Sequence, residues 1–136
     1  MKRKRLLFLF LVALTVVLCG CGEKAKKPEK IKDIEYTVQE ESQVPEELLN
    51  KMKEKQKEPF QMTYETEDYV YIAKGYGTQA TSGYSIRVLE LYEAAEGIVF
   101  SAELIGPGKD EPVLQVETYP YLVVKIPNFG MDVLFQ

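Results

Sequence analysis

Alternation of apolar and polar residues over most of the chain is the feature that most constrains its fold. From Phe60 onward the apolar residues recur at every second position or in short runs, and no second helical period occurs. Short alternating stretches separated by turn residues are typical of strands. The sequence predicts strands in eight segments, of which the shortest, at 113–116, has the weakest pattern: 34–38, 60–64, 69–73, 84–91, 98–104, 113–116, 121–126 and 131–135.

One segment between the first two strands has helical character. Pro45 suits a first helical turn, and the acidic residues that follow it complement the positive end of a helix. Leu48, Leu49 and Met52 form an apolar stripe, and Pro59 ends the helix. The sequence therefore predicts an α+β fold, in which one N-terminal helix packs on a mainly antiparallel sheet of about six or seven strands, as a sandwich or a partial barrel.

Turn chemistry marks the connections. The pattern changes phase at Val88-Leu89, as it does at a β-bulge, and residues 94–97 form a turn. Residues 74–83 (KGYGTQATSG) are rich in glycine but lack the Gly-Lys-Ser/Thr end of a phosphate-binding loop. We therefore expect these glycines to supply positive φ angles or close backbone packing.

The N-terminal segment has the pattern of an export signal. Residues 2–5 are basic and residues 6–18 form an apolar run, which is too short for an ordinary membrane-spanning helix. The sequence Leu18-Cys19-Gly20-Cys21 that follows resembles the lipobox of bacterial lipoproteins. This resemblance implies a signal peptide at 1–20, lipidation of Cys21 and a lipid-anchored protein on the extracytoplasmic side of the cell membrane. Two alternatives stay open: Cys19 as the acceptor, and an uncleaved signal anchor.

Charge divides the remaining chain into a tether and a body. Residues 21–33 are rich in lysine and contain Pro28, which predicts a soluble tether or a contact with anionic headgroups. Residues 34–136 carry 8 basic and 18 acidic residues, so the body is acidic. Nucleic-acid binding needs clustered cations, and we expect no nucleic-acid partner.

Residue types restrict the chemistry further. The chain has no His, and lipidation together with cleavage would leave no free thiol, which excludes Ser-His-Asp and Cys-His catalysis. Carboxylate pairs such as Glu90 with Glu93, or Glu103 with Glu117, are the remaining catalytic candidates. The acidic turn at 65–68 lacks the spacing of a calcium loop. We expect no catalytic residue, no metal and no cofactor.

Two motifs resemble a known family. Thr81-Ser82-Gly83-Tyr84-Ser85-Ile86 and the segment 118–127 (TYPYLVVKIP) are similar to the Thr-Gly-Gly-Tyr-Ser-Ile and Tyr-Pro-(apolar)-Lys signatures of the PrcB C-terminal domain family. The resemblance covers residues 34–136. Ser82 replaces the usual second glycine, and Ala80 stands where proline is common. Any role of the family's second glycine in letting another backbone approach closely is therefore not expected at position 82. Membership implies a membrane-associated subunit that associates with a surface protease and helps to stabilise it, without catalysis.

The resemblance gives the candidate sites. We predict Thr81, Gly83, Tyr84, Tyr119, Pro120 and Lys125 as partner-binding residues. The predicted partners are membrane lipid, through Cys21, and a protein, with a protease as the first candidate. The main alternative is an envelope module that binds a peptide or a cell-wall component through a strand edge and the Gly-rich loop. A carboxylate hydrolase is the third interpretation.

Overall fold

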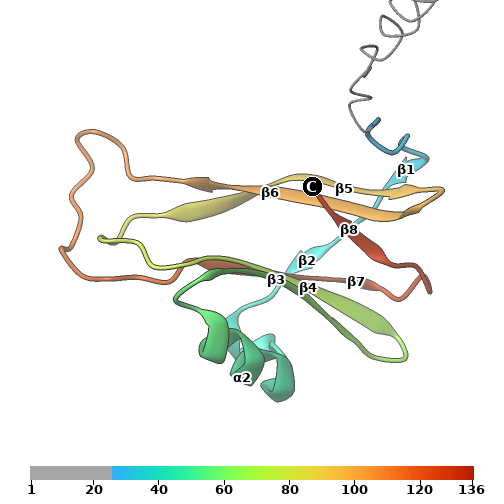
Figure 1. The fold of residues 1–136 in the computed structure, drawn as a ribbon, viewed down its shortest axis with the longest axis horizontal. Coiled ribbons are helices and arrows are strands. Elements are labelled where there is room, and N and C mark those ends of the chain that lie inside the picture. Colours follow the sequence, from blue (N-terminus) through green and yellow to red (C-terminus); the bar gives the residue numbers. More distant parts are fainter. Residues whose placement is uncertain (1–25) are drawn as a thin grey trace, which may run out of the picture.

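The computed structural model describes residues 26–136, which form two four-stranded sheets and one α-helix (Figure 1). The first sheet has the order β1-β5-β6-β8, with β1 (Lys32–Asp33), β5 (Ser85–Ala94), β6 (Gly97–Ile105) and β8 (Val133–Phe135). The second has the order β2-β7-β4-β3, with β2 (Thr37–Val38), β7 (Tyr121–Pro127), β4 (Tyr69–Tyr76) and β3 (Pro59–Glu65). The helix α2 (Glu46–Lys55) follows the 3-10 turn η1 (Glu41–Gln43).

The core lies between the two sheets. Alternate residues of β4 and β7, among them Ile72 and Val124, meet Ile98 and Phe100 of β6, and all four are fully or almost fully buried. Complete burial of one such side chain stabilises the folded state by about 1.5–3 kcal/mol. The architecture is therefore a sandwich, and the described residues do not close into a barrel.

The helix covers the outer face of the second sheet. Leu48 and Met52 of α2 are buried against Phe60, Ala73 and Val123, which point away from the sandwich core. The predicted strand number of about six or seven is thus corrected to eight strands among residues 26–136, divided between two sheets, and of the two predicted arrangements the structure has the sandwich. The helix forms a third layer outside them, as Figure 1 shows. Within residues 26–136, α2 is too short and too polar to cross a bilayer.

The predicted strand at 34–38 is divided between the sheets. Lys32–Asp33 pairs with β5 and Thr37–Val38 pairs with β7, so the chain crosses from one sheet to the other between Ile34 and Thr37. Only Ile34 is buried in the core, while Tyr36 and Val38 are 42% and 53% exposed. The alternation seen in the sequence therefore does not correspond to one buried face. Ordered structure also begins before the predicted boundary at Ile34.

Several local predictions are confirmed. The strands at 60–64 and 69–73 form the β3–β4 hairpin, and the β5–β6 register shifts between Val88 and Glu90, where a bulge was expected. β5 and β6 are joined at Ala94 and Gly97, the predicted turn. The C-terminal segment forms β8, but it pairs with β6 in the parallel direction.

The strand predicted at 113–116 is wrong. These residues form no strand, and Leu114 and Val116 are 70% and 50% exposed. The backbone N–H of Leu114 donates to Ser82 Oγ, and its carbonyl accepts from the Ser82 N–H. Because both backbone groups bond to one residue of a loop, Leu114 has none left for a strand neighbour.

Candidate functional site

Two long loops, each of which connects one sheet to the other, pair at one end of the sandwich. Residues 77–84 join β4 to β5, and residues 106–120 join β6 to β7 (Figure 1). Gln79 and Thr118 exchange two backbone hydrogen bonds of 2.8 and 3.0 Å across the loops. We call these two segments the paired loops. Each supplies the hydrogen-bond partners that an isolated loop would have to take from water.

Side chains add to this pairing. The Thr118 hydroxyl donates to the carbonyl of Thr81 at 2.7 Å, and the Thr81 hydroxyl donates to the carbonyl of Ser82 at 3.0 Å. Ser82 binds Leu114 through its hydroxyl and its N–H, at 2.8 and 3.1 Å. Thr81 is consequently half-buried and is not on a freely exposed loop.

Gly83 occupies a position that only glycine fits well. Its φ is +92°, in the region that L-residues rarely adopt. A Cβ atom there would lie 2.9 Å from Pro107 Cβ and 3.1 Å from a Val113 methyl group. The glycine therefore permits close packing of one paired loop on the other.

Tyr84, Tyr119 and Pro120 lie at the base of the paired loops. All three are partly buried, and the Tyr84 ring packs beside Gly106. The carbonyl of Pro120 accepts the N–H of Tyr76 at 3.0 Å, which aligns the start of β7 with the end of β4. The structure therefore brings five of the six predicted residues to one end of the molecule.

Lys125 is not part of this group. Four residues after the start of β7, it lies about 13 Å further along the strand, on the face that carries the helix. Its ammonium group lies 4.6 Å from the centre of the Tyr69 ring, a cation–π contact. With Tyr36 and Thr37 these residues line a shallow pocket of about 360 Å³.

The surface of the paired loops carries a group of exposed apolar residues that sequence reasoning did not assign. Leu114 is 70% exposed, Val116 is 50% exposed, and Ile105 at the end of β6 is 38% exposed. The apolar alternation at 113–116 was the signal for them, but it was interpreted as a strand. Aliphatic side chains exposed to this extent offer apolar area to a protein partner.

Tyr76 lies beneath the paired loops with an unusual environment. Its hydroxyl is buried and has no hydrogen-bond partner among the described residues. Burial, with a smaller contribution from the charge of Glu103, raises the pKa of this hydroxyl. It stays neutral at physiological pH.

Three of the four candidate carboxylates are engaged in ion pairs. Glu90 pairs with Lys27, Glu93 with Lys32 at 3.2 Å, and Glu103 with Arg87. These are surface contacts, worth about 0–1 kcal/mol each.

The acidic turn is held by an amide. Asn128 Nδ2 donates to Glu65 Oε1 and to the carbonyl of Thr66, both at 2.8 Å. Among residues 26–136 no three His, Cys, Asp or Glu side chains gather as metal ligands would.

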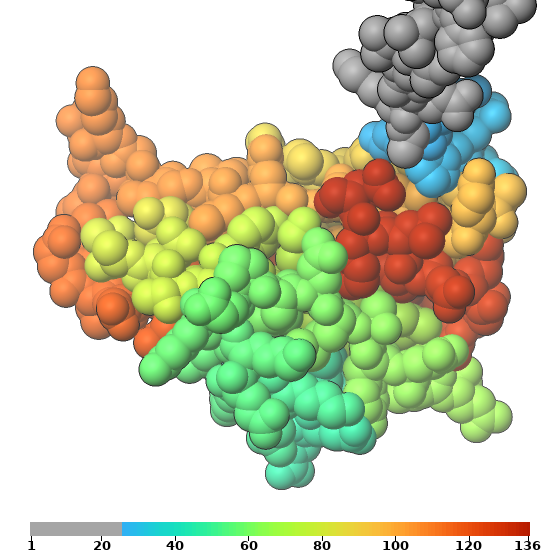
Figure 2. Space-filling view, viewed as in Figure 1, coloured from blue at the N-terminus to red at the C-terminus, as the bar shows by residue number. Residues whose placement is uncertain are grey.

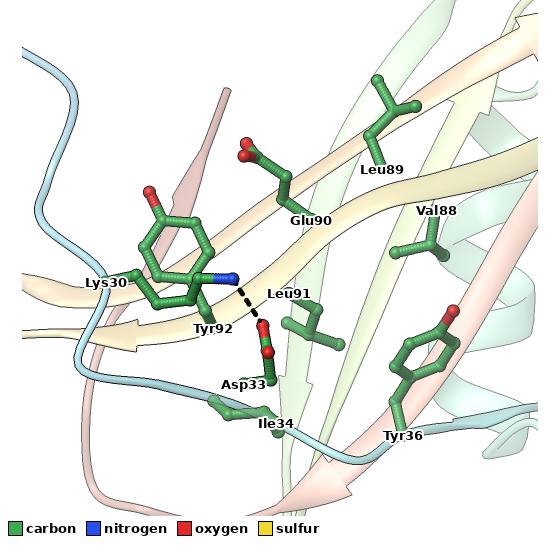
Figure 3. Close-up of a pocket in the computed structure, with 9 residues that line it drawn as sticks. All are labelled: Lys30, Asp33, Ile34, Tyr36, Val88, Leu89, Glu90, Leu91 and Tyr92. Atoms are coloured by element: carbon green, nitrogen blue, oxygen red, sulfur yellow. Dashed lines mark hydrogen bonds and ion pairs between the residues drawn. The ribbon is translucent and has the colours of Figure 1, made fainter.

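The last residues of the predicted tether lie against the first sheet. The Tyr92 hydroxyl donates to the carbonyl of Pro28 at 2.9 Å, and the N–H of Ile31 donates to the carbonyl of Glu93 at 2.8 Å. Figure 3 shows Lys30 beside the Tyr92 ring and paired with Asp33. Both charged residues border a pocket of about 330 Å³ between this segment and β5. Residues 28–33 are called the docked segment below.

Cys19, Cys21 and the signal peptide at 1–20 lie outside the described residues. Their roles, including lipid anchoring, stay predictions from the sequence.

The fold and the paired loops define a small, mainly β domain of the sandwich type, in which Leu114, the most exposed of the large apolar side chains among residues 26–136, lies on the 106–120 loop. Residues 70–127 match the family model described as PrcB C-terminal, so the predicted resemblance to that family is confirmed for this segment. The match runs from β4 to β7 and contains the paired loops and all six predicted partner-binding residues. No curated protein and no solved structure matches the chain significantly.

Proposed function

We propose that this protein is a lipid-anchored, non-catalytic subunit that binds a surface protease through its paired loops. The observation that carries the proposal is the match of residues 70–127 to the PrcB C-terminal family, because the matched segment contains both loops. The exposed Leu114 and Val116 offer apolar area to a partner.

The position of the docked segment supports an orientation of the domain in which the paired loops face away from the membrane. It lies along the part of β5 near the Ala94–Gly97 turn, and the paired loops lie at the opposite end of the sandwich (Figure 1). If Cys21 carries the lipid, the chain between Cys21 and Pro28 spans about 24 Å at most. The domain then stays close to the membrane, with the paired loops at the end away from the attachment point.

Chemical crosslinking on intact cells, followed by mass spectrometry of captured partners, tests the proposal. We expect a surface protease among the crosslinked products, and its yield should fall when Cys21→Ala releases the protein from the membrane. Capture of cell-wall material without any protease would contradict the proposal.

A second candidate is an envelope module that binds a peptide or a cell-wall component. The pocket lined by Tyr36, Tyr69 and Lys125 favours it, since aromatic faces beside a cation suit sugars and extended peptides. Tyr69→Ala should then abolish retention on isolated cell walls. The protease hypothesis predicts no change in partner capture for the same variant.

A further inference from the structure

The two sheets differ in how their edges are protected. β1 and β2 are two residues long, β8 is three residues long, and the open part of β5 contains the bulge between Val88 and Glu90. Short strands and bulges are devices that prevent pairing with another chain. β3 has neither: its seven residues pair with β4 in one unbroken register, and its other side has no strand neighbour among the described residues.

The free edge of β3 carries backbone groups that are ready to pair. Tyr76 donates its N–H towards β7, so the even-numbered residues of β4 bond to β7 and its odd-numbered residues bond to β3. The partners of these odd-numbered residues in β3 are Phe60, Met62 and Tyr64. It follows that the N–H and C=O groups of Gln61, Thr63 and Glu65 point away from the sheet.

This edge is accessible and is flanked by pockets. Gln61, Thr63 and Glu65 are exposed, and in Figure 2 the green surface of this region lies at the front with no other element over it. One pocket, of about 470 Å³, lies between α2 and the start of β3 and includes Lys57 and Met62. A second pocket, of about 440 Å³, includes Gln61, Lys74 and Tyr76.

The second pocket contains a cation with no acidic neighbour. Among residues 26–136 no carboxylate lies within ion-pair distance of Lys74, whose ammonium group lies 5.6 Å from the centre of the Tyr76 ring. Lys74 is directly opposite Gln61 in the β3–β4 register. A strand added beside β3 would lie two strand spacings, about 10 Å, from β4. The side chains of Lys74 and of a glutamate on the added strand can together span this distance, passing over Gln61.

We propose that the free edge of β3 binds an extended segment of a partner protein by strand addition, with an acidic side chain of that segment directed at Lys74. Main-chain hydrogen bonds to Gln61, Thr63 and Glu65 supply affinity. The two pockets select alternate side chains, and Lys74 selects the acidic one. The backbone groups and the cation that this proposal uses belong to β3 and β4 and not to the paired loops, so it does not depend on the function proposed for those loops.

The probe for the test is a blocked eight-residue peptide of alternating valine and threonine with one central threonine replaced by glutamate. Its controls carry glutamine or lysine at that position. Binding to the full chain in a nonionic detergent is measured by fluorescence anisotropy, and amide protection by hydrogen exchange with mass spectrometry.

We expect the glutamate peptide to bind and to slow exchange in the peptic fragments that cover β3. Lys74→Glu should weaken that peptide by about three- to fivefold and strengthen the lysine peptide by a similar factor. Lys109→Glu, an exposed lysine on a paired loop, should change neither affinity.

The backbone contacts have their own control. Thr63→Pro removes an N–H that the β3–β4 ladder does not use and should abolish binding, whereas Thr63→Ala keeps the N–H and should retain it. Circular dichroism confirms that both variants are folded. Absence of binding by all three peptides, protection at β5 instead of β3, or self-association of the chain through β3 in sedimentation would each overturn the proposal.

Discussion

Replacing Gly83 with alanine should destabilise the protein by about 2–4 kcal/mol. An L-residue held at a φ of +92° costs about 1–2 kcal/mol. The new Cβ would lie 2.9 Å from Pro107 Cβ, and overpacking of this kind costs about 1 kcal/mol or more. The two contributions have different origins, and the chain offers a way to separate them.

Gly130 is the matched control. Its φ is +67°, but nothing lies within 4 Å of the position that its Cβ would take. Gly130→Ala should therefore show only the backbone contribution, about 1–2 kcal/mol. Gly108 has no positive φ, and a Cβ atom there would lie 3.8 Å from its nearest neighbour. Gly108→Ala should therefore change the free energy of unfolding by less than about 0.5 kcal/mol.

Urea unfolding of the full chain, followed by circular dichroism, measures the difference. With a slope of about 1.5 kcal/mol per molar urea, the midpoint should fall by about 1.3–2.7 M for Gly83→Ala and by about half of that for Gly130→Ala. Equal shifts for the two variants would refute the conclusion that Gly83 is selected for close packing between the paired loops.

Three further predictions follow from the same contacts. Thr81→Ala should lower the free energy of unfolding by less than about 1 kcal/mol, because its hydroxyl makes one local hydrogen bond, and should reduce the yield of partner crosslinking on cells. Cys21→Ala should abolish incorporation of a palmitate analogue, and labelling that survives in this variant but is lost in Cys19→Ala would move the acceptor to Cys19. Burial lowers the pKa of Lys74, so the native state binds its proton less tightly than the unfolded state and the charged form destabilises the fold. Lys74→Met should therefore raise the urea midpoint at pH 7, and the gain should shrink as the pH rises towards the ordinary lysine pKa of 10.5.

The local elements could be predicted because their signals are local. The apolar stripe of Leu48 and Met52, bounded by two prolines, predicts the helix without reference to the rest of the chain. The alternation at Phe60, Met62 and Tyr64 predicts a strand that is buried on one face, which is where the helix packs.

The arrangement of these elements depends on contacts that alternation does not report. Ile34 and Val38 follow one period of two, yet the chain crosses between sheets between them. At 113–116 the exposed Leu114 is held by Ser82, a residue 32 positions earlier in the chain. Long-range pairing of this kind depends on the whole fold.

Only part of the candidate site could be predicted from the sequence, because it also depends on long-range contacts. The motif residues Thr81, Gly83, Tyr84, Tyr119 and Pro120 lie in two segments of the chain, and only the paired loops bring them together. Lys125 belongs to the second motif, but the length of β7 places it on a different surface.

Photocrosslinking from the paired loops tests the central claim most directly. A photoreactive residue at Leu114, on the paired loops, is compared on intact cells with one at Asn50, on the exposed face of α2. The account predicts a crosslinked surface protease from position 114 and none from position 50. Crosslinking of the protease from position 50 alone, or from neither position while the protein is anchored at the surface, would contradict it.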